Sequence, residues 1–212
     1  MPYSSSIQSI FIGILIYYAL LSVWYTLLLI ASFPEVIRRY REITFGNILH
    51  TLEQESLIPI TIITPAYNEE KNITNMLHNL LRSHYKNFEV IVVNDGSTDS
   101  TLKILIDEFS LYQVPKIIKS SIQTAKIKSC YRSTQFKNLL VIDKEHASFH
   151  SAADAINVGV NACKTPIMLT IDADTFIEPE ALTRLVFSFL SKTNCLAVGG
   201  SVYVLNEDQV VN

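Results

Sequence analysis

The feature that most constrains this sequence is its uncharged N-terminus, because residues 1–34 contain no Asp, Glu, Lys or Arg. Within it, residues 10–33 read IFIGILIYYALLSVWYTLLLIASF. As a helix this run would be about 36 Å long, enough to cross a hydrocarbon core of about 30 Å. A cleaved signal peptide is the alternative, but the run is too long and has neither a basic segment before it nor an A-x-A site after it. We expect residues 1–34 to form one transmembrane anchor.

Three arginines follow the span, Arg38, Arg39 and Arg41, against the two acidic residues Glu35 and Glu42. An excess of Lys and Arg beside a span marks its cytoplasmic side. The chain is therefore expected to cross the membrane once, with its N-terminus outside and everything after the anchor in the cytosol. Residues 35–56 are interpreted as a connector near the membrane surface.

From residue 57 onward, short apolar runs alternate with helical patterns, which is typical of a parallel α/β sheet. Strands are expected at 57–64, 88–93, 114–119, 138–143, 166–171 and 195–204, with 166–171 in the centre of the sheet. Helices are expected at 68–83, 99–109, 151–162 and 180–190. The second helix would be capped by Ser97 or Thr98. The polar stretch 120–137 is interpreted as an irregular insertion.

Charge and cysteine content exclude several kinds of function. The formal net charge is −3 and the 17 Lys and Arg residues form no long run, which argues against binding to nucleic acid, whose phosphates need a basic surface. The three cysteines are far apart and have no C-x-x-C spacing. Neither a disulfide framework nor a zinc site is therefore expected.

Two polar loops follow the first two expected strands, at the ends where open α/β sheets bind ligands. In TPAYNEE (64–70), Asn68 and the two glutamates either cap the next helix and favour its dipole, or line a ligand site. In NDGSTD (94–99), Asp95 is either a turn residue or an acceptor for a uracil ring or a ribose hydroxyl. The residues of each loop taken alone leave both alternatives open.

A third loop, IDADT (171–175), places Asp172 and Asp174 directly after an apolar strand. Two neighbouring carboxylates repel each other, and a cation bound beside them relieves that repulsion. Oxygen ligands select a hard divalent ion such as Mg²⁺ or Mn²⁺, which can neutralise charge that develops on a diphosphate leaving group. The alternative is a pair of solvated surface aspartates.

The order and spacing of these loops resemble glycosyltransferase family 2, the GT-A type. The resemblance is strongest to the membrane-bound synthases of polysaccharides such as hyaluronan, cellulose and poly-N-acetylglucosamine. It covers about residues 57–206, through TPAYNEE (64–70), VVNDGSTDST (92–101), ADAINVG (153–159), IDADT (171–175) and AVGG (197–200). It implies that residues 57–212 form a nucleotide-sugar-binding domain of the GT-A fold, a Rossmann-like, mostly parallel sheet with flanking helices.

The resemblance also implies roles for single residues. The base and ribose of the nucleotide would be lined by Pro65, Ala66, Tyr67 and Glu69, and Asp95 would contact the base. Asp172 would lie near the diphosphate and ribose and share the metal ion with Asp174, the main metal ligand. Asn157 would support the helix that faces the diphosphate.

Two departures from the family pattern stand out. The Gly-Gly-Lys element that precedes the helix matching ADAIN, and whose lysine neutralises phosphate, is replaced by HASFHSA (146–152), in which only His150 is a candidate substitute. The acidic general base of the family and its Q-x-x-R-W element would lie beyond Asn212. Glu207 and Asp208 come too early to match that base. We therefore expect only the donor-binding half of an enzyme, without an identified catalytic base.

The function that the resemblance implies is transfer of a sugar, N-acetylglucosamine or glucose, from a UDP donor to a polysaccharide with inversion. A non-catalytic alternative is a truncated fragment or a pseudoenzyme that works beside a second membrane subunit. A third alternative is a glycosyltransferase that acts on a lipid-linked acceptor.

Overall fold

The computed structural model describes the backbone of residues 3–44, 58–116, 118, 121–147, 151–191 and 194–202. The side chains of residues 3–6, 38–44 and 151 are outside this description. The chain divides into two compact units, Met1–Glu53 and Gln54–Asn212.

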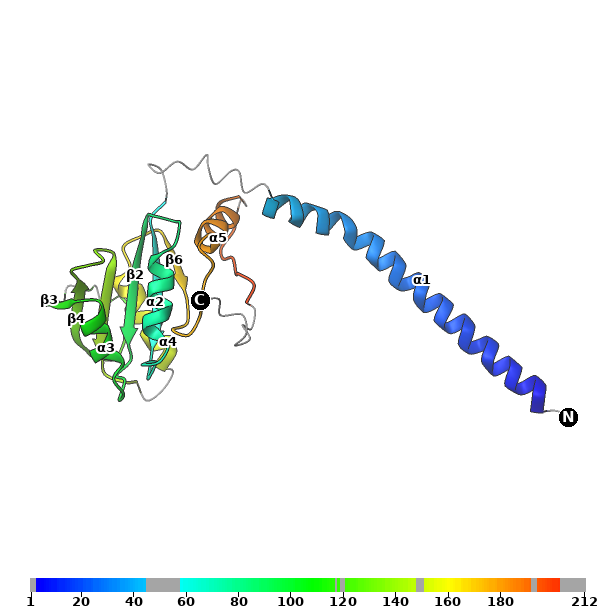
Figure 1. Ribbon diagram of the computed structural model, residues 1–212, viewed down its shortest axis with the longest axis horizontal. Helices are drawn as coiled ribbons and strands as arrows, with labels where there is room; N and C mark the ends of the chain where they lie inside the picture. Colours follow the sequence, from blue (N-terminus) through cyan, green and yellow to red (C-terminus); the bar gives the residue numbers. More distant parts are fainter. Residues whose placement is uncertain are drawn as a thin grey trace. The chain divides into compact units, whose positions relative to one another are not determined.

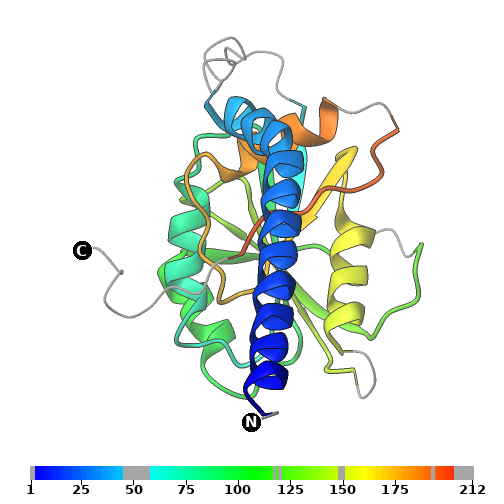
Figure 2. The ribbon, with the colours of Figure 1, turned by 90° about the vertical axis from the view of Figure 1, so that its right-hand side faces the viewer.

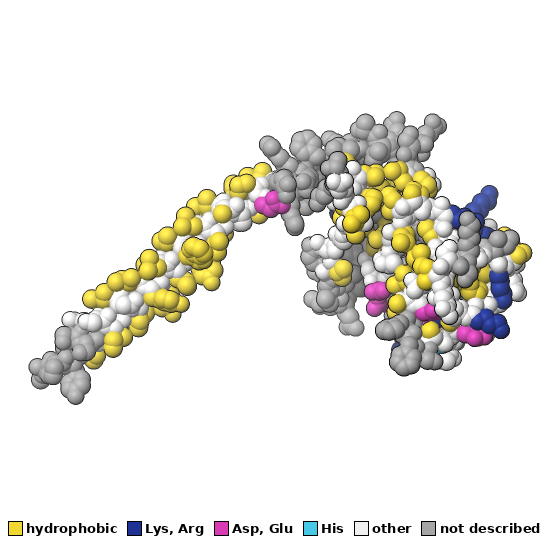
Figure 3. Space-filling view, turned by 180° about the vertical axis from the view of Figure 1, so that it is seen from behind, with side chains coloured by type: hydrophobic (Ala, Val, Ile, Leu, Met, Phe, Trp, Pro, Cys, Tyr) yellow, Lys and Arg dark blue, Asp and Glu magenta, His cyan; other side chains and the backbone are white. Residues whose placement is uncertain are grey.

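The first unit contains one long helix, α1 (Tyr3–Thr44), with Pro34 inside it. Its segment Ile7–Ile37 has a mean hydropathy of 2.1 and no buried residues in its most apolar window. Hydrophobic side chains cover the visible face of this segment along most of its length (Figure 3). At 1.5 Å per residue these 31 residues extend about 46 Å, which is longer than a hydrocarbon core. An N-terminal helix long and apolar enough to cross a membrane is thus confirmed.

The second unit contains a six-stranded sheet in the order β3-β4-β5-β2-β1-β6 (Figure 1). Three neighbouring pairs, β1–β2, β1–β6 and β2–β5, are parallel, and the pairs β3–β4 and β4–β5 are antiparallel. The strands are β1 (Ile60–Ala66), β2 (Phe88–Asn94), β3 (Leu111–Val114), β4 (Ile127–Ser133), β5 (Leu139–Lys144) and β6 (Ile167–Thr170). The mostly parallel sheet expected from the sequence is confirmed.

Helices cover both faces of this sheet. The helices are α2 (Ile73–Leu81), α3 (Thr101–Glu108), α4 (Ser151–Ala162) and α5 (Ala181–Leu190). Figure 2 shows α4 on the opposite side of the sheet from α2 and α3. Right-handed crossovers explain this, because the chain moves from β1 to β2 in one direction across the sheet and returns from β5 to β6 in the other.

Each face has its own buried cluster. On the α2 and α3 face, side chains such as Ile62, Val92 and Leu105 pack together, and Leu182 of α5 joins them. On the α4 face, Ala155 and Val158 pack against Ile91, Val93 and Ile142. Gly159 allows α4 to approach β1 closely, since a β-carbon there would lie 2.4 Å from Cγ2 of Ile63.

The interpretation of residues 120–137 as an irregular insertion is wrong, because they contain β4. The sequence pattern does not indicate this strand, because polar residues occupy buried positions on the side that faces the core. Ser133, for example, is buried and its hydroxyl donates a hydrogen bond to the backbone oxygen of Phe109 (2.6 Å). The strand expected at 114–119 lies instead at Leu111–Val114.

The expectation that the strand at 166–171 lies in the centre of the sheet is wrong. β6 pairs with β1 and is the last strand of the sheet in the described part of the chain, and its Met168 is 54% exposed. The strand expected at 195–204 is also absent from the described residues 195–202, where Leu196 is 96% exposed. An apolar run indicates burial only if a neighbouring strand or helix covers it.

Two helices begin later than expected. α2 begins at Ile73 rather than at residue 68, because Asn68 has a left-handed backbone (φ 57°) that ends any helical path there. α3 begins at Thr101, and its N-cap is Ser100 rather than Ser97 or Thr98. The remaining expected helices agree with α4 and α5 to within one residue.

Candidate functional site

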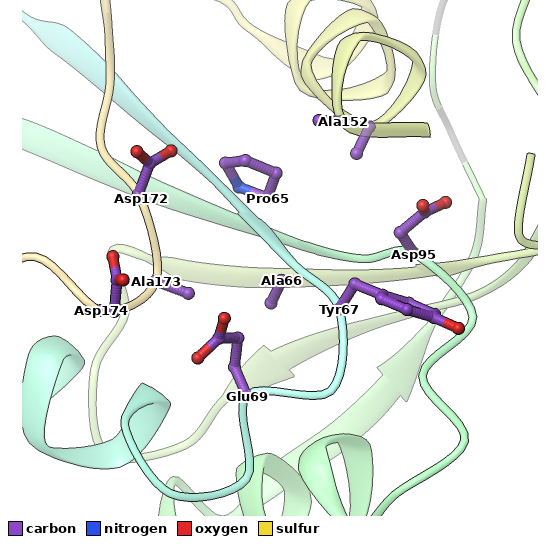
Figure 4. A pocket seen from close by; sticks show the side chains of 10 residues that line it. Pro65, Ala66, Tyr67, Glu69, Asp95, Ala152, Asp172, Ala173 and Asp174 are labelled. Carbon is purple, nitrogen blue, oxygen red and sulfur yellow. The ribbon is translucent and has the colours of Figure 1, made fainter. Parts of the chain in front are cut away.

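The parallel strands β1, β2, β5 and β6 end at the same edge of the sheet, and β1 is the strand at which the chain order reverses. Ligands of open α/β sheets bind at such a point. A pocket of about 260 Å³ lies there, and Figure 4 shows its side chains. It is lined by Pro65, Ala66, Tyr67, Glu69, Asp95, Ala152, Ala155, Asp172, Ala173 and Asp174.

Hydrogen bonds join the two loops that follow β1 and β2. Asn68 Oδ1 accepts from the backbone N–H of Thr98 (2.8 Å) and of Asp99 (3.4 Å). In return, Asp99 Oδ2 accepts from the Glu70 N–H (3.2 Å), and Glu70 Oε2 accepts from the Ser100 N–H (3.0 Å). The side chain of Asn68 therefore braces the neighbouring loop and does not cap α2, whose N-cap is Asn72.

Asp99 also holds the start of α3. Partial burial raises the pKa of its carboxyl group, but hydrogen bonds from the Thr101 hydroxyl, the Thr101 N–H and the Glu70 N–H outweigh this effect. The net result is a pKa below the ordinary value for aspartate. A carboxylate that accepts several hydrogen bonds is stabilised in its charged form, so this brace is strongest when Asp99 is ionised.

Asp95, at the end of β2, is almost fully buried, with 3% of its side chain exposed. Its Oδ1 forms an ion pair and hydrogen bond with Nζ of Lys144, the last residue of β5. Lys144 is fully buried, and its Nζ also lies 2.9 Å from Oδ2 of Asp154 in the first turn of α4. Asp95 is therefore more than a turn residue, since it belongs to a buried charged group at the wall of the pocket.

His146 covers the outer side of this group. Its ring stacks on Tyr67, with ring centroids 4.5 Å apart and planes 25° from parallel. Its Nδ1 hydrogen-bonds the backbone oxygen of Asp95 (2.9 Å). Gly96 makes the approach possible, because its backbone is left-handed (φ 63°) and a β-carbon would lie 2.7 Å from the backbone nitrogen of His146.

Asp172 and Asp174 lie on the loop after β6, at the side of the pocket away from Asp95 (Figure 4). Both are exposed, and within the described residues neither carboxylate has a hydrogen bond or ion pair that would occupy it. No group of three or more His, Cys, Asp or Glu side chains suited to a metal occurs in the described ranges.

All seven residues that the sequence assigned to donor or metal binding line this one pocket. Asn157 is half-buried on α4 and does not line it, and His150, Glu207 and Asp208 lie outside the described residues. Sequence reasoning missed Lys144 and His146. The burial of Lys144 could have been inferred from β5, because side chains alternate between the two faces of a strand and Lys144 lies on the same buried face as Ile142.

Comparison with known proteins was made by sequence and by structure. The family described as "Glycosyl transferase family 2" matches residues 61–130 and 119–211. "Poly-beta-1,6-N-acetyl-D-glucosamine synthase" of Staphylococcus aureus (strain COL) is 23% identical over 172 residues, covering 81% of this chain and 35% of that protein. "Glycosyltransferase GlyA" of Streptococcus pneumoniae serotype 4 is 29% identical over 150 residues, covering 71% of this chain and 18% of that protein.

Among solved structures, S. aureus TarS 1–349 is similar with a TM-score of 0.45 and 26% identity, covering 63% of this chain and 32% of that one. The chain spans about a third or less of the length of these curated relatives. The match to the family covers more than half of the chain, and the resemblance that the motifs indicated is confirmed.

Proposed function

Because the chain belongs to glycosyl transferase family 2, we propose that residues 57–212 bind a UDP-sugar together with Mg²⁺ or Mn²⁺ and present the sugar for inverting transfer. Residues 1–34 would form the membrane anchor and residues 35–56 the connector. The sugar would be N-acetylglucosamine or glucose, and the acceptor a polysaccharide.

The observation that carries this proposal is the charge of the pocket. Four of its ten lining residues are acidic, namely Glu69, Asp95, Asp172 and Asp174, and none of the ten is basic. A diphosphate would be repelled by such a pocket unless a cation lay between them. Exposed carboxylates are the ligands that Mg²⁺ and Mn²⁺ prefer, so the residues present fit such an ion.

The two ends of the pocket suit the two ends of a nucleotide sugar. Tyr67 and Asp95 would take the uracil base, and Asp172 and Asp174 would hold the ion beside the diphosphate. The N-terminal part of α4, which contains Ala152 and Ala155, borders the space between them. The free N–H groups of a helix start favour a phosphate at that position.

The chemistry of this site would be activation of the donor. The bound ion would neutralise the charge that develops on the diphosphate as it leaves. The chain's own residues would orient the donor, with Asp95 holding the base and α4 bordering the phosphates, and orientation is a large part of the rate enhancement in group transfer. Inversion also needs a base to remove the proton of the acceptor hydroxyl, and we assign no described residue to that role.

The test is calorimetric titration of the chain with UDP, GDP and ADP in the presence of Mn²⁺. We expect UDP to bind at least about tenfold more tightly than either purine nucleotide, because the proposed base subsite is bordered by Tyr67 and Asp95, and His146 stacks on Tyr67. A purine nucleotide that binds as tightly as UDP would contradict the assignment of this pocket to a UDP donor.

The polymeric acceptor is proposed from the similarity to the S. aureus poly-beta-1,6-N-acetyl-D-glucosamine synthase. A lipid-linked acceptor is the second candidate, and a non-catalytic partner of another membrane subunit is the third. Incubation of membranes that carry the chain with labelled UDP-N-acetylglucosamine or UDP-glucose separates these candidates, and label found in polymer would favour the first. Label found in lipid instead would favour the second candidate, and no transfer above an Asp174→Ala control would favour the third.

The orientation of the anchor gives a separate prediction. Arg38, Arg39 and Arg41 follow the apolar span, so we propose that residues 57–212 face the cytosol and the N-terminus lies outside. A reporter fused after Asn212 should be active only if it is of a kind that works in the cytosol. Activity of a reporter that requires export would contradict this orientation.

A further inference from the structure

Lys144 is the most unusual residue near the pocket. Its side chain has 0% exposure at the end of β5, although lysine is almost never fully buried without a partner. Two carboxylates meet its ammonium group, Asp95 from β2 and Asp154 from α4. Lys144, Asp95 and Asp154 therefore connect the strands β5 and β2 to α4, whose first turn borders the pocket.

The two oxygens of Asp95 have different surroundings. Oδ1 receives the Lys144 ammonium, whereas Oδ2 is buried and has no hydrogen-bond donor among the described residues. His146 Nδ1 lies 3.0 Å from Oδ2, but its hydrogen bond goes to the backbone oxygen of the same residue. A buried carboxylate oxygen without a donor is costly. Because Asp95 lines the pocket, a ligand is the natural source of the missing donor.

We propose that Lys144 is a positioning residue that makes the pocket selective for uracil. By holding Oδ1, it fixes the rotation of the Asp95 carboxylate and leaves Oδ2 as the acceptor without a donor. The imide N3–H of uracil supplies the missing donor. Cytosine has a lone pair at N3 and is repelled by the same oxygen. This inference rests on the proposed function, since it concerns the base of the same UDP donor.

Asp154 helps to hold the Lys144 ammonium group in place. Its Oδ1 accepts a hydrogen bond from the Ala125 N–H (3.1 Å), and its Oδ2 holds the Lys144 ammonium. The lysine is thereby held by a second carboxylate besides that of Asp95. A lysine needed only to join β5 to α4 would require Asp154 alone, and Asp95 would then be free to pair elsewhere.

The test compares UDP with CDP by calorimetry in Mn²⁺, for the whole chain and for Lys144→Met. We expect the wild-type chain to prefer UDP by about tenfold to a hundredfold, the range of a hydrogen bond to a charged group. In Lys144→Met this preference should fall to within about threefold of unity, while CDP affinity changes little. Lys126→Met is the matched control, because Lys126 is 78% exposed and pairs only loosely with Glu145 (4.0 Å). It should keep the wild-type preference.

A Lys144→Met variant that keeps the wild-type preference, or that loses UDP and CDP affinity equally, would overturn the positioning role. A wild-type chain that binds UDP and CDP equally would overturn uracil selectivity itself. If the wild-type chain binds no UDP, the proposed function fails first. If Lys144→Met does not fold, the double variant Lys144→Met/Asp154→Asn replaces it, because it removes one charge of each sign. The ratio of its UDP and CDP affinities is then compared with that of the wild type.

Discussion

Replacing Asp174 by alanine is expected to weaken UDP binding in Mn²⁺ by at least about 100-fold. Loss of a group that only hydrogen-bonds to a metal ligand already costs about 10- to 100-fold in metal affinity, and Asp174 is proposed to bind the ion directly. Without the ion, the remaining acidic residues of the pocket would repel the diphosphate. Calorimetry with UDP measures the effect, and the wild-type chain in EDTA should behave like the variant in Mn²⁺.

Glu178→Ala is the matched control for this substitution. Glu178 lies four residues further along the same loop, is exposed, and pairs with Arg184 (2.8 Å) outside the pocket. Its loss should leave UDP affinity within about twofold of wild type, because exposed ion pairs contribute little. Equal UDP affinity of Asp174→Ala, the wild type and the EDTA-treated chain would refute a metal at this position.

Gly96→Ala is expected to destabilise residues 57–212 by about 2–5 kcal/mol and to weaken UDP binding. A left-handed backbone costs a residue with a β-carbon about 1–2 kcal/mol, and Gly96 has a φ of 63°. The new β-carbon would also lie 2.7 Å from the backbone nitrogen of His146, and such overpacking costs about 1–3 kcal/mol. Urea denaturation of the detergent-solubilised chain measures the first effect.

The control for Gly96→Ala is the same substitution at Gly199, which is exposed and has no atom within 4 Å of the position of a β-carbon. It should change stability by no more than about 0.5 kcal/mol, as for most surface substitutions. If the two variants unfold at the same urea concentration, the close contact between Gly96 and His146 does not stabilise the site.

The location of the candidate site could be predicted because it follows from the topology. Parallel strands end at one edge, so loops that carry polar residues after β1, β2 and β6 had to meet. Pro65, Tyr67, Asp95 and Asp174 come from three separate parts of the sequence and line one pocket. The apolar runs of β1 and β2 were also predictable, since both strands are buried on both faces.

The parts of the fold that were missed depend on partners that a sequence pattern does not reveal. β4 buries Ser129 and Ser133: Ser129 lies opposite Asp143 of the neighbouring strand, and the Ser133 hydroxyl donates a hydrogen bond to the backbone oxygen of Phe109. Lys144 was overlooked because a lysine at a strand end ordinarily points to solvent. The positions of Asp95 and Asp154, 49 and 10 residues away in the sequence, explain how its charge is paired when it is buried.

The TPAYNEE and NDGSTD motifs each contain residues that hold the two loops together and residues that line the pocket proposed to bind UDP. Asn68, Glu70 and Asp99 hold the two loops together, and Tyr67, Glu69 and Asp95 line the pocket. Neighbouring residues of one motif therefore have different tasks. A pattern of residue types records both tasks at once, and only the direction of each side chain separates them.

The most direct test of a metal-dependent UDP site is the anomalous difference map of a crystal grown with UDP and Mn²⁺, because anomalous scattering locates manganese independently of the nucleotide. We expect one manganese peak within bonding distance of an Asp174 carboxylate oxygen and of the diphosphate. The uracil ring should lie beside Asp95 Oδ2. UDP bound outside the pocket at the ends of β1, β2 and β6, or UDP within it and no manganese beside Asp174, would contradict the account.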